Sequence, residues 1–185
     1  MYSLESAFRV VTREDFLPPA AQDAADFDVP LAIGYGQTNS QPSTVRLMLT
    51  WLDPQRGEKI LDVGFGSGWT TALLAHLVGL GGKVYAVEKV PQLVQFGASN
   101  CRRFGVQNAQ FFAAGKTLGL RDFAPYDRIL VSAAATSLPA ELLGQLKVGG
   151  TMVIPIKHSI HVITKTGDKN HDTVEHPGFV FVPLV

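Results

Sequence analysis

Three alternating glycines after a short apolar run are the part of this sequence that most clearly points to ligand binding. The run KILDV (59–63) leads directly into Gly64, Gly66 and Gly68. Glycines allow a tight turn, and they let backbone N–H groups approach a ligand at the start of a helix. Glu88 follows Gly68 by 20 residues, close to the spacing of about 20 at which nucleotide-binding sequences place an acid on the ribose hydroxyls. The spacing therefore predicts a loop for a ligand that carries a ribose.

The glycines do not form a dinucleotide-binding pattern. That pattern, G-x-G-x-x-G, needs glycine at the position that Trp69 occupies. The residues present are Asp62, Gly64, Gly66, Gly68 and Glu88. Their order of acid, alternating glycines, helix, strand and acid resembles the first motifs of class I S-adenosylmethionine-dependent methyltransferases. The resemblance implies that S-adenosylmethionine is the cofactor and that the glycine loop holds its methionine part. The alternative is a turn that only packs tightly, and the strand, helix and second acid around it argue against that.

Strand-like and helix-like segments alternate from about residue 59 onward, and they must position these residues. Short apolar runs predict strands, and apolar positions at helical spacing predict helices. The predicted strands are 59–63, 83–88, 109–113, 127–132 and 149–156, and the predicted helices are 70–78, 91–105 and 138–146. The alternation predicts an α/β fold with a mostly parallel sheet covered on both faces. Two closing strands, 161–166 and 178–184, have only a polar turn at 166–178 between them, so we expect that end of the sheet to be antiparallel.

The first 58 residues follow a different pattern. A helix is predicted at 3–11 and another at 41–52, with an irregular stretch at 13–41 between them. A long irregular stretch inside a compact domain is usually functional. We therefore expect residues 1–58 to cover the substrate and the cofactor, and residues 59–185 to form the S-adenosylmethionine-binding core, the two together making one compact domain.

The stretch 30–42 contains the sequence Gly-Gln-Thr-x-Ser-x-Pro, which resembles the signature loop of protein-L-isoaspartate O-methyltransferases. Further resemblance to this family extends over nearly the whole chain, at 13–16, 60–75, 124–135, 142–156 and 181–184. It implies a doubly wound, seven-stranded Rossmann-like sheet with an N-terminal extension. It also implies a role in protein repair, in which the α-carboxylate of L-isoaspartyl residues in damaged proteins or peptides is methylated.

Ser40 matches the active-site serine of that family. A carboxylate acceptor has a reference pKa of about 3.9 and is already ionised at pH 7, so the reaction needs no strong base. A hydroxyl that binds one carboxylate oxygen and orients the other is then sufficient, which is the role that the resemblance implies for Ser40. The alternative is that Ser40 caps the following helix. Gln37 and Thr38 match loop positions near the cofactor and the substrate, although the Thr38 hydroxyl could instead bond its own turn.

The segment after the predicted strand 109–113 departs from the family pattern. After the predicted strand 109–113 the family usually has Gly-Asp-Gly, whose acid approaches the adenine, and this chain has Ala114-Gly115-Lys116. Backbone groups around Gly115 can still hold the base. We expect Lys116 to be solvated, and the alternative is that it reaches a carboxylate of the substrate or the cofactor.

Composition excludes several other classes of protein. Lys plus Arg and Asp plus Glu number 16 each, so the formal net charge is +0 and there is no general attraction to nucleic acid or to an anionic membrane. Cys101 is the single cysteine, which fits a reducing compartment. We expect a cytoplasmic monomer without a signal peptide or a metal. Two alternatives stay open: a methyltransferase of this fold that acts on another carboxylate, and a catalytically weakened relative that only binds.

Overall fold

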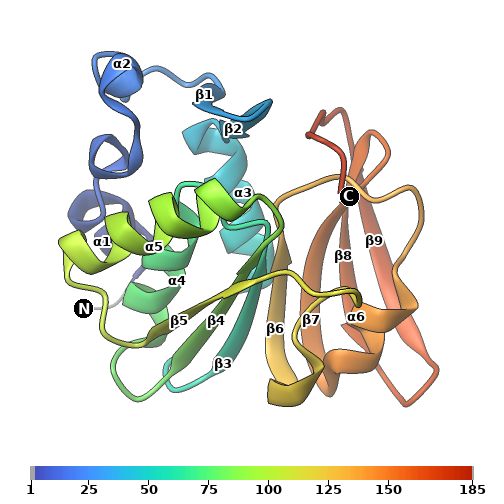
Figure 1. Cartoon of the computed structure of the whole chain (residues 1–185). Coiled ribbons are helices and arrows are strands. Elements are labelled where there is room, and N and C mark those ends of the chain that lie inside the picture. Colours follow the sequence, from blue (N-terminus) through green and yellow to red (C-terminus); the bar gives the residue numbers. More distant parts are fainter. Residues whose placement is uncertain (1–2, 185) are drawn as a thin grey trace.

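The computed structural model describes residues 3–184 and contains a seven-stranded sheet in the order β5-β4-β3-β6-β7-β8-β9 (Figure 1). The strands are β3 (Lys59–Val63), β4 (Lys83–Glu88), β5 (Ala109–Ala113), β6 (Tyr126–Val131), β7 (Leu146–Ile156), β8 (Ser159–Lys165) and β9 (His171–Pro177). Strands β3 to β7 are parallel to their neighbours, and β8 and β9 are antiparallel. The predicted α/β sheet, with five parallel strands and an antiparallel end, is confirmed.

Helices cover both faces of the sheet because the side chains of each strand alternate between its two sides. Ile60 packs into one core with α1 (Leu4–Val10), α3 (Pro42–Leu52), α4 (Trp69–Val78) and α5 (Pro91–Phe104). The next residue, Leu61, packs into a second core on the opposite face, with α6 (Ala140–Gln145). All five predicted helices are therefore present, with boundaries shifted by a few residues. None of the helices within residues 3–184 combines the length and apolar character that crossing a bilayer requires.

The last strand is not where the sequence predicted it. The predicted strand 178–184 is wrong, and β9 lies at His171–Pro177, inside the segment predicted to be a polar turn. An edge strand needs only backbone pairing with one neighbour, here β8, so its side chains can be polar and exposed. The apolar residues of 178–184 pack irregularly instead: Phe179 and Phe181 contact the first core and Leu184 contacts the second.

The stretch 13–41 is more ordered than predicted. It contains a 3-10 helix, η1 (Arg13–Phe16), a short helix, α2 (Pro19–Gln22), and a hairpin of β1 (Leu31–Gly34) and β2 (Gln37–Asn39). Positive φ angles at three successive residues, Gly34, Tyr35 and Gly36, make the tight turn of this hairpin. Figure 1 shows the hairpin and the C-terminal tail at the same end of the sheet.

Candidate active site

A cavity of about 270 Å³ lies at the carboxyl ends of the parallel strands. The chain runs from β3 through β4 to β5 on one side and returns to β6 on the other, and open α/β sheets bind ligands at such a reversal of strand order. Its lining comes from the segments 37–40, 63–67, 87–90, 114–119, 132–133 and 182–184, with single residues from elsewhere. No group of three or more His, Cys, Asp or Glu residues in the described part of the chain is arranged to hold a metal ion.

Glycine is required in the loop after β3 for two different reasons. Gly64 and Gly66 line the cavity. Their φ angles are 79° and 50°, and residues that carry a side chain rarely adopt positive φ. Gly68 has a φ of 88° but does not line the cavity. A Cβ on Gly68 would lie 2.7 Å from the carbonyl oxygen of Gly97 and 2.8 Å from Cys101 Sγ. Gly68 therefore allows α5 to pack against the start of α4, which holds the loop in place.

Glu88, at the end of β4, lines the cavity beside the glycine loop and is buried. Its Oε2 accepts a hydrogen bond from the backbone N–H of Gly66 at 3.0 Å. Its Oε1 accepts hydrogen bonds from the backbone N–H groups of Lys89 at 2.7 Å and Val90 at 2.9 Å. These three bonds fix the carboxylate and occupy both lone pairs of Oε1, which leaves a lone pair on Oε2 that can accept a ribose hydroxyl. The arrangement fits a ribose-bearing cofactor.

Asp62 lies in β3, just before the glycine loop. It is fully buried and does not line the cavity. Its Oδ2 accepts hydrogen bonds from Thr70 at 3.0 Å and Thr71 at 2.7 Å, both in the first turn of α4. Its Oδ1 has no hydrogen-bond partner among the described residues. Burial raises the pKa of Asp62 to about 6, against the opposing effect of the threonine bonds. Asp62 thus anchors the helix that follows the loop, and a contact between Asp62 and the cofactor stays a prediction.

Ser40 lines the cavity, and its hydroxyl has no hydrogen-bond partner within residues 3–184. The residue that caps α3 is Gln41, whose side chain makes no capping bond. Asp28 performs that task, because its Oδ1 accepts a hydrogen bond from the backbone N–H of Ser43 at 2.8 Å. The capping role considered for Ser40 is therefore wrong, and its hydroxyl is available to a ligand.

Gln37 and Thr38 line the same part of the cavity as Ser40. The Thr38 hydroxyl makes no hydrogen bond to its own turn, because Thr38 lies in β2 and pairs with Ala32 of β1. The amide of Gln37 makes one long hydrogen bond, 3.5 Å, to the carbonyl oxygen of Tyr35. Both side chains are thus positioned to meet a ligand.

The loop after β5 keeps its shape without the family's acid. Gly115 and Lys116 line the cavity, and Lys116 is exposed. Gln145 of α6 fixes the loop with two hydrogen bonds of 2.8 Å. It accepts one from the backbone N–H of Leu120 and donates one to the carbonyl oxygen of Leu118. A Cβ on Gly115 would meet nothing within 4 Å. The backbone of this loop can therefore border the base of a nucleoside.

Several residues of the site were not predicted as site residues. Asn39, Ser67 and Ser132 line the cavity. Arg13 is buried and does not line it, but it donates hydrogen bonds to Asn39 and Ser40, which do. Arg13 and Asn39 belong to the stretches that resemble the isoaspartyl family, which is the signal that could have identified them. Ser67 and Ser132 lie in two further stretches of that resemblance, 60–75 and 124–135.

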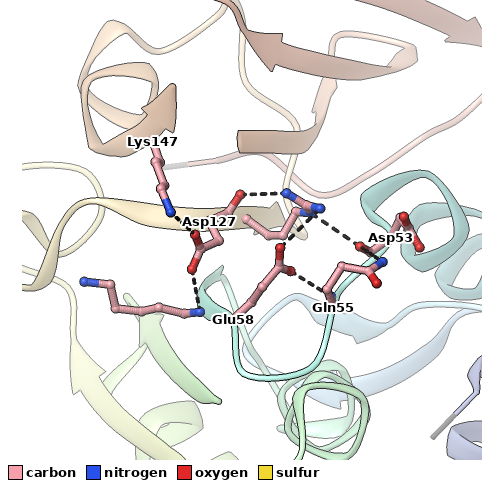
Figure 2. Close-up of polar contacts among 7 residues, drawn as sticks. Asp53, Gln55, Glu58, Asp127 and Lys147 are labelled. Atoms are coloured by element: carbon pink, nitrogen blue, oxygen red, sulfur yellow. Dashed lines mark hydrogen bonds and ion pairs between the residues drawn. The ribbon is translucent and has the colours of Figure 1, made fainter. Parts of the chain in front are cut away.

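A second polar cluster lies at the opposite end of the sheet, where β3 and β6 begin (Figure 2). Asp127 accepts hydrogen bonds from the backbone N–H of Lys59 and from Lys147 Nζ, both at 2.9 Å. Although burial opposes the effect, these bonds hold the pKa of Asp127 below its usual value. Glu58 and Arg128 form an ion pair at 3.2 Å. This cluster fastens the loop before β3 and is separate from the cavity.

Comparisons with known proteins agree with this geometry. The family described as protein-L-isoaspartate(D-aspartate) O-methyltransferase matches residues 3–185. A protein-L-isoaspartate O-methyltransferase of Methanocella arvoryzae is 41% identical over 177 residues, covering 95% of this chain and 94% of the relative. One from Aeropyrum pernix is 45% identical over 187 residues, covering 98% of this chain and 72% of the relative.

Two solved structures share the whole fold. A protein-L-isoaspartate O-methyltransferase superposes with a TM-score of 0.89 at 27% identity, covering 98% of this chain and 61% of that longer chain. A beta-aspartate methyltransferase from Plasmodium falciparum, in complex with S-adenosyl-L-homocysteine, superposes with a TM-score of 0.86 at 25% identity. That match covers 98% of this chain and 89% of the other.

Proposed function

Because this chain belongs to the protein-L-isoaspartate(D-aspartate) O-methyltransferase family, we propose that it transfers a methyl group from S-adenosylmethionine to the α-carboxylate of L-isoaspartyl residues in damaged proteins or peptides. The observation that carries the proposal is one cavity that joins the glycine loop and Glu88 to the hydroxyl of Ser40, which has no hydrogen-bond partner among the described residues. A nucleoside-bearing donor and a carboxylate acceptor can meet there.

The residues for the cofactor follow the carboxyl ends of three adjacent strands. Gly64 and Gly66 border the methionine part, Glu88 Oε2 accepts a ribose hydroxyl, and the backbone at Gly115 borders the adenine. When bound, the cofactor supplies a methyl group on a positively charged sulfur. The protein supplies a rigid loop and a fixed carboxylate, so little reorganisation is needed when the cofactor binds.

The acceptor side needs orientation more than proton transfer. An isoaspartyl carboxylate is ionised at pH 7. Ser40 donates a hydrogen bond to one of its oxygens, which leaves the other oxygen free to face the methyl group. Holding two reactants in line in this way can supply roughly 7–11 kcal/mol of the barrier reduction. Gln37 and Thr38, on the same loop, border the acceptor and the cofactor.

The test compares an isoaspartyl peptide with the same peptide carrying normal aspartate, using S-adenosylmethionine with a labelled methyl group. We expect label in the isoaspartyl peptide only. Label in neither peptide, with S-adenosylmethionine binding seen by calorimetry, would point to another carboxylate acceptor. Absence of both label and binding would point to a weakened relative.

We also propose that residues 1–58 form the part of the domain that covers both ligands, since the hairpin end and Ser40 line the cavity. A cytoplasmic monomer is the assembly and location that we propose. Cys101 is the single cysteine and is a free thiol, which fits a reducing compartment. Light scattering on the purified protein tests the monomer.

A further inference from the structure

Arg13 is a buried arginine whose partners are almost all backbone carbonyls. Only 6% of it is exposed. Its Nη1 donates to the carbonyl oxygens of Ala25 at 3.2 Å and Phe27 at 3.0 Å. Its Nη2 donates to the carbonyl oxygens of Val29, Asn39 and Ser40, at 2.8, 3.1 and 3.0 Å. The guanidinium group thus gathers the whole segment between η1 and α3 around one point.

The contacts of Arg13 continue to the cofactor loop through a side chain. Arg13 Nε donates to Asn39 Oδ1 at 2.7 Å, and Asn39 Nδ2 donates to Ser67 Oγ at 2.9 Å. All three side chains are buried. Ser67 lies between Gly66 and Gly68, so this chain of hydrogen bonds joins the loop of Ser40 to the glycine loop.

Arg13 also lies near an aromatic ring, that of Trp69. The guanidinium carbon lies 5.7 Å from the centre of the Trp69 ring, and Trp69 Nε1 donates to the carbonyl oxygen of Val11 at 3.1 Å. Only the planar fork of arginine can donate in so many fixed directions, and lysine cannot reproduce it. The position is therefore sensitive to geometry as well as to charge.

We propose that Arg13 is a positioning residue for the methyl transfer: through the Ser40 carbonyl, and through Asn39 and Ser67, it sets the placement of the acceptor loop relative to the cofactor loop. This inference rests on the proposed function for its kinetic part. A methyl transfer that depends on alignment should lose rate when these two loops move independently, because misplacement by about 1 Å can cost 100-fold.

The kinetic test uses Arg13→Lys, Ser67→Ala and the double variant, assayed below the melting temperature of each. We expect Arg13→Lys to lower kcat for an isoaspartyl peptide by about 10- to 100-fold, with the Kd for S-adenosylhomocysteine within about threefold of the original protein. Ser67→Ala should give a smaller loss of kcat. The double variant should be no slower than Arg13→Lys, because both changes break the same connection.

Arg128→Lys is the matched control. Arg128 also holds a loop, pairing with Glu58 and donating to the carbonyl oxygen of Asp53 at 3.4 Å, but at the opposite end of the sheet. We expect this variant to lower the melting temperature and leave kcat unchanged. If Arg13→Lys behaves in the same way, Arg13 is a structural clamp and the proposal is overturned.

Hydrogen–deuterium exchange tests the connection without any activity. Arg13→Lys and Ser67→Ala should both speed amide exchange in residues 37–41 and in 64–68, whereas Arg128→Lys should affect only residues near 53–58. Exchange that changes in one loop alone would contradict the proposal. If the original protein methylates no isoaspartyl peptide, the proposed function fails and this measurement still decides whether Arg13 joins the loops.

Discussion

Ser40 and Asp28 divide two tasks that the sequence could assign to a single serine. A serine just before a helix is a common cap, and the sequence alone leaves capping and ligand binding equally open at Ser40. The structure gives the capping bond to Asp28, which lies 15 residues before the Ser43 N–H that it accepts. Ser40, whose hydroxyl makes no hydrogen bond within residues 3–184, is consequently left to line the cavity.

The first prediction follows from this division at the residue scale. Ser40→Ala should lower kcat for the isoaspartyl peptide by about 10- to 100-fold, the loss of one hydrogen bond to a charged group. The melting temperature and the Kd for S-adenosylhomocysteine should stay unchanged. Asp28→Ala is the matched comparison: it removes the capping bond itself, so it should lower the melting temperature where Ser40→Ala does not. The opposite pattern in the two variants would mean that Ser40 supports the helix after all.

Gly115 lines the part of the cavity where we propose that the adenine of the cofactor binds, and it presents no side chain there. Its absent side chain leaves open space where a carboxylate would fit. Gly115→Asp should therefore add an acceptor beside the adenine and lower the Kd for S-adenosylmethionine several-fold, as calorimetry would show. Gly115→Asn has the same shape without the charge and should have a smaller effect. An unchanged Kd in both variants would place the base elsewhere.

At the scale of elements, the glycine loop depends on the contact between α4 and α5. Gly68 immediately precedes α4 and has a positive φ, and α5 passes so close that a Cβ on Gly68 would collide with it. Gly97 of α5 is needed for the same reason, since its own Cβ would lie 2.5 Å from the carbonyl oxygen of Gly66. The two helices therefore set the loop's shape from outside the cavity.

Gly68→Ala should accordingly destabilise the protein and weaken cofactor binding together. Overpacking of this kind costs about 1–3 kcal/mol, and the positive φ adds to the cost. Urea denaturation measures the free energy of unfolding, and calorimetry measures cofactor binding. Gly144→Ala, at a helical glycine whose Cβ would meet nothing, is the control: it should raise the free energy of unfolding by about 0.5–1 kcal/mol and leave cofactor binding unchanged. A Gly68→Ala protein with normal stability would show that the helices can move apart at no cost.

At the scale of the whole molecule, Asp62 makes folding depend on pH. Its pKa is about 6 in the folded protein and 3.8 in the unfolded chain. The folded state therefore binds the proton more tightly, and the stabilising effect is complete below pH 3.8 and is lost as the pH rises through 6. A shift of about two units corresponds to about 3 kcal/mol.

Asp62→Asn removes this titration. The free energy of unfolding of the original protein, measured in urea, should fall by about 2 kcal/mol relative to the variant between pH 4.5 and pH 7. The difference between the two proteins should become constant above about pH 7. Parallel pH curves for the two proteins would mean that Asp62 does not titrate in this range.

Local features of the sequence predicted the sheet and the cofactor side of the cavity. The alternation of strands and helices follows from side-chain periodicity, which is a property of neighbouring residues. The glycine loop and Glu88 are likewise local, since positive φ angles at Gly64 and Gly66 require glycine and an acid at the end of the next strand lies beside them. Ser40, Gln37 and Thr38 were identified by family resemblance, and the structure places all three along the cavity.

Only the tertiary structure decided the remaining features, because each depends on groups far apart in the chain. The edge strand β9 is held by backbone pairing with β8, which leaves little mark on its composition, while the apolar tail after it packs without forming a strand. The connection from Arg13 through Asn39 to Ser67 spans separations of 26 and 28 residues. Neither periodicity nor local propensity reports contacts at such distances, so the joining of the acceptor loop to the cofactor loop became visible only in three dimensions.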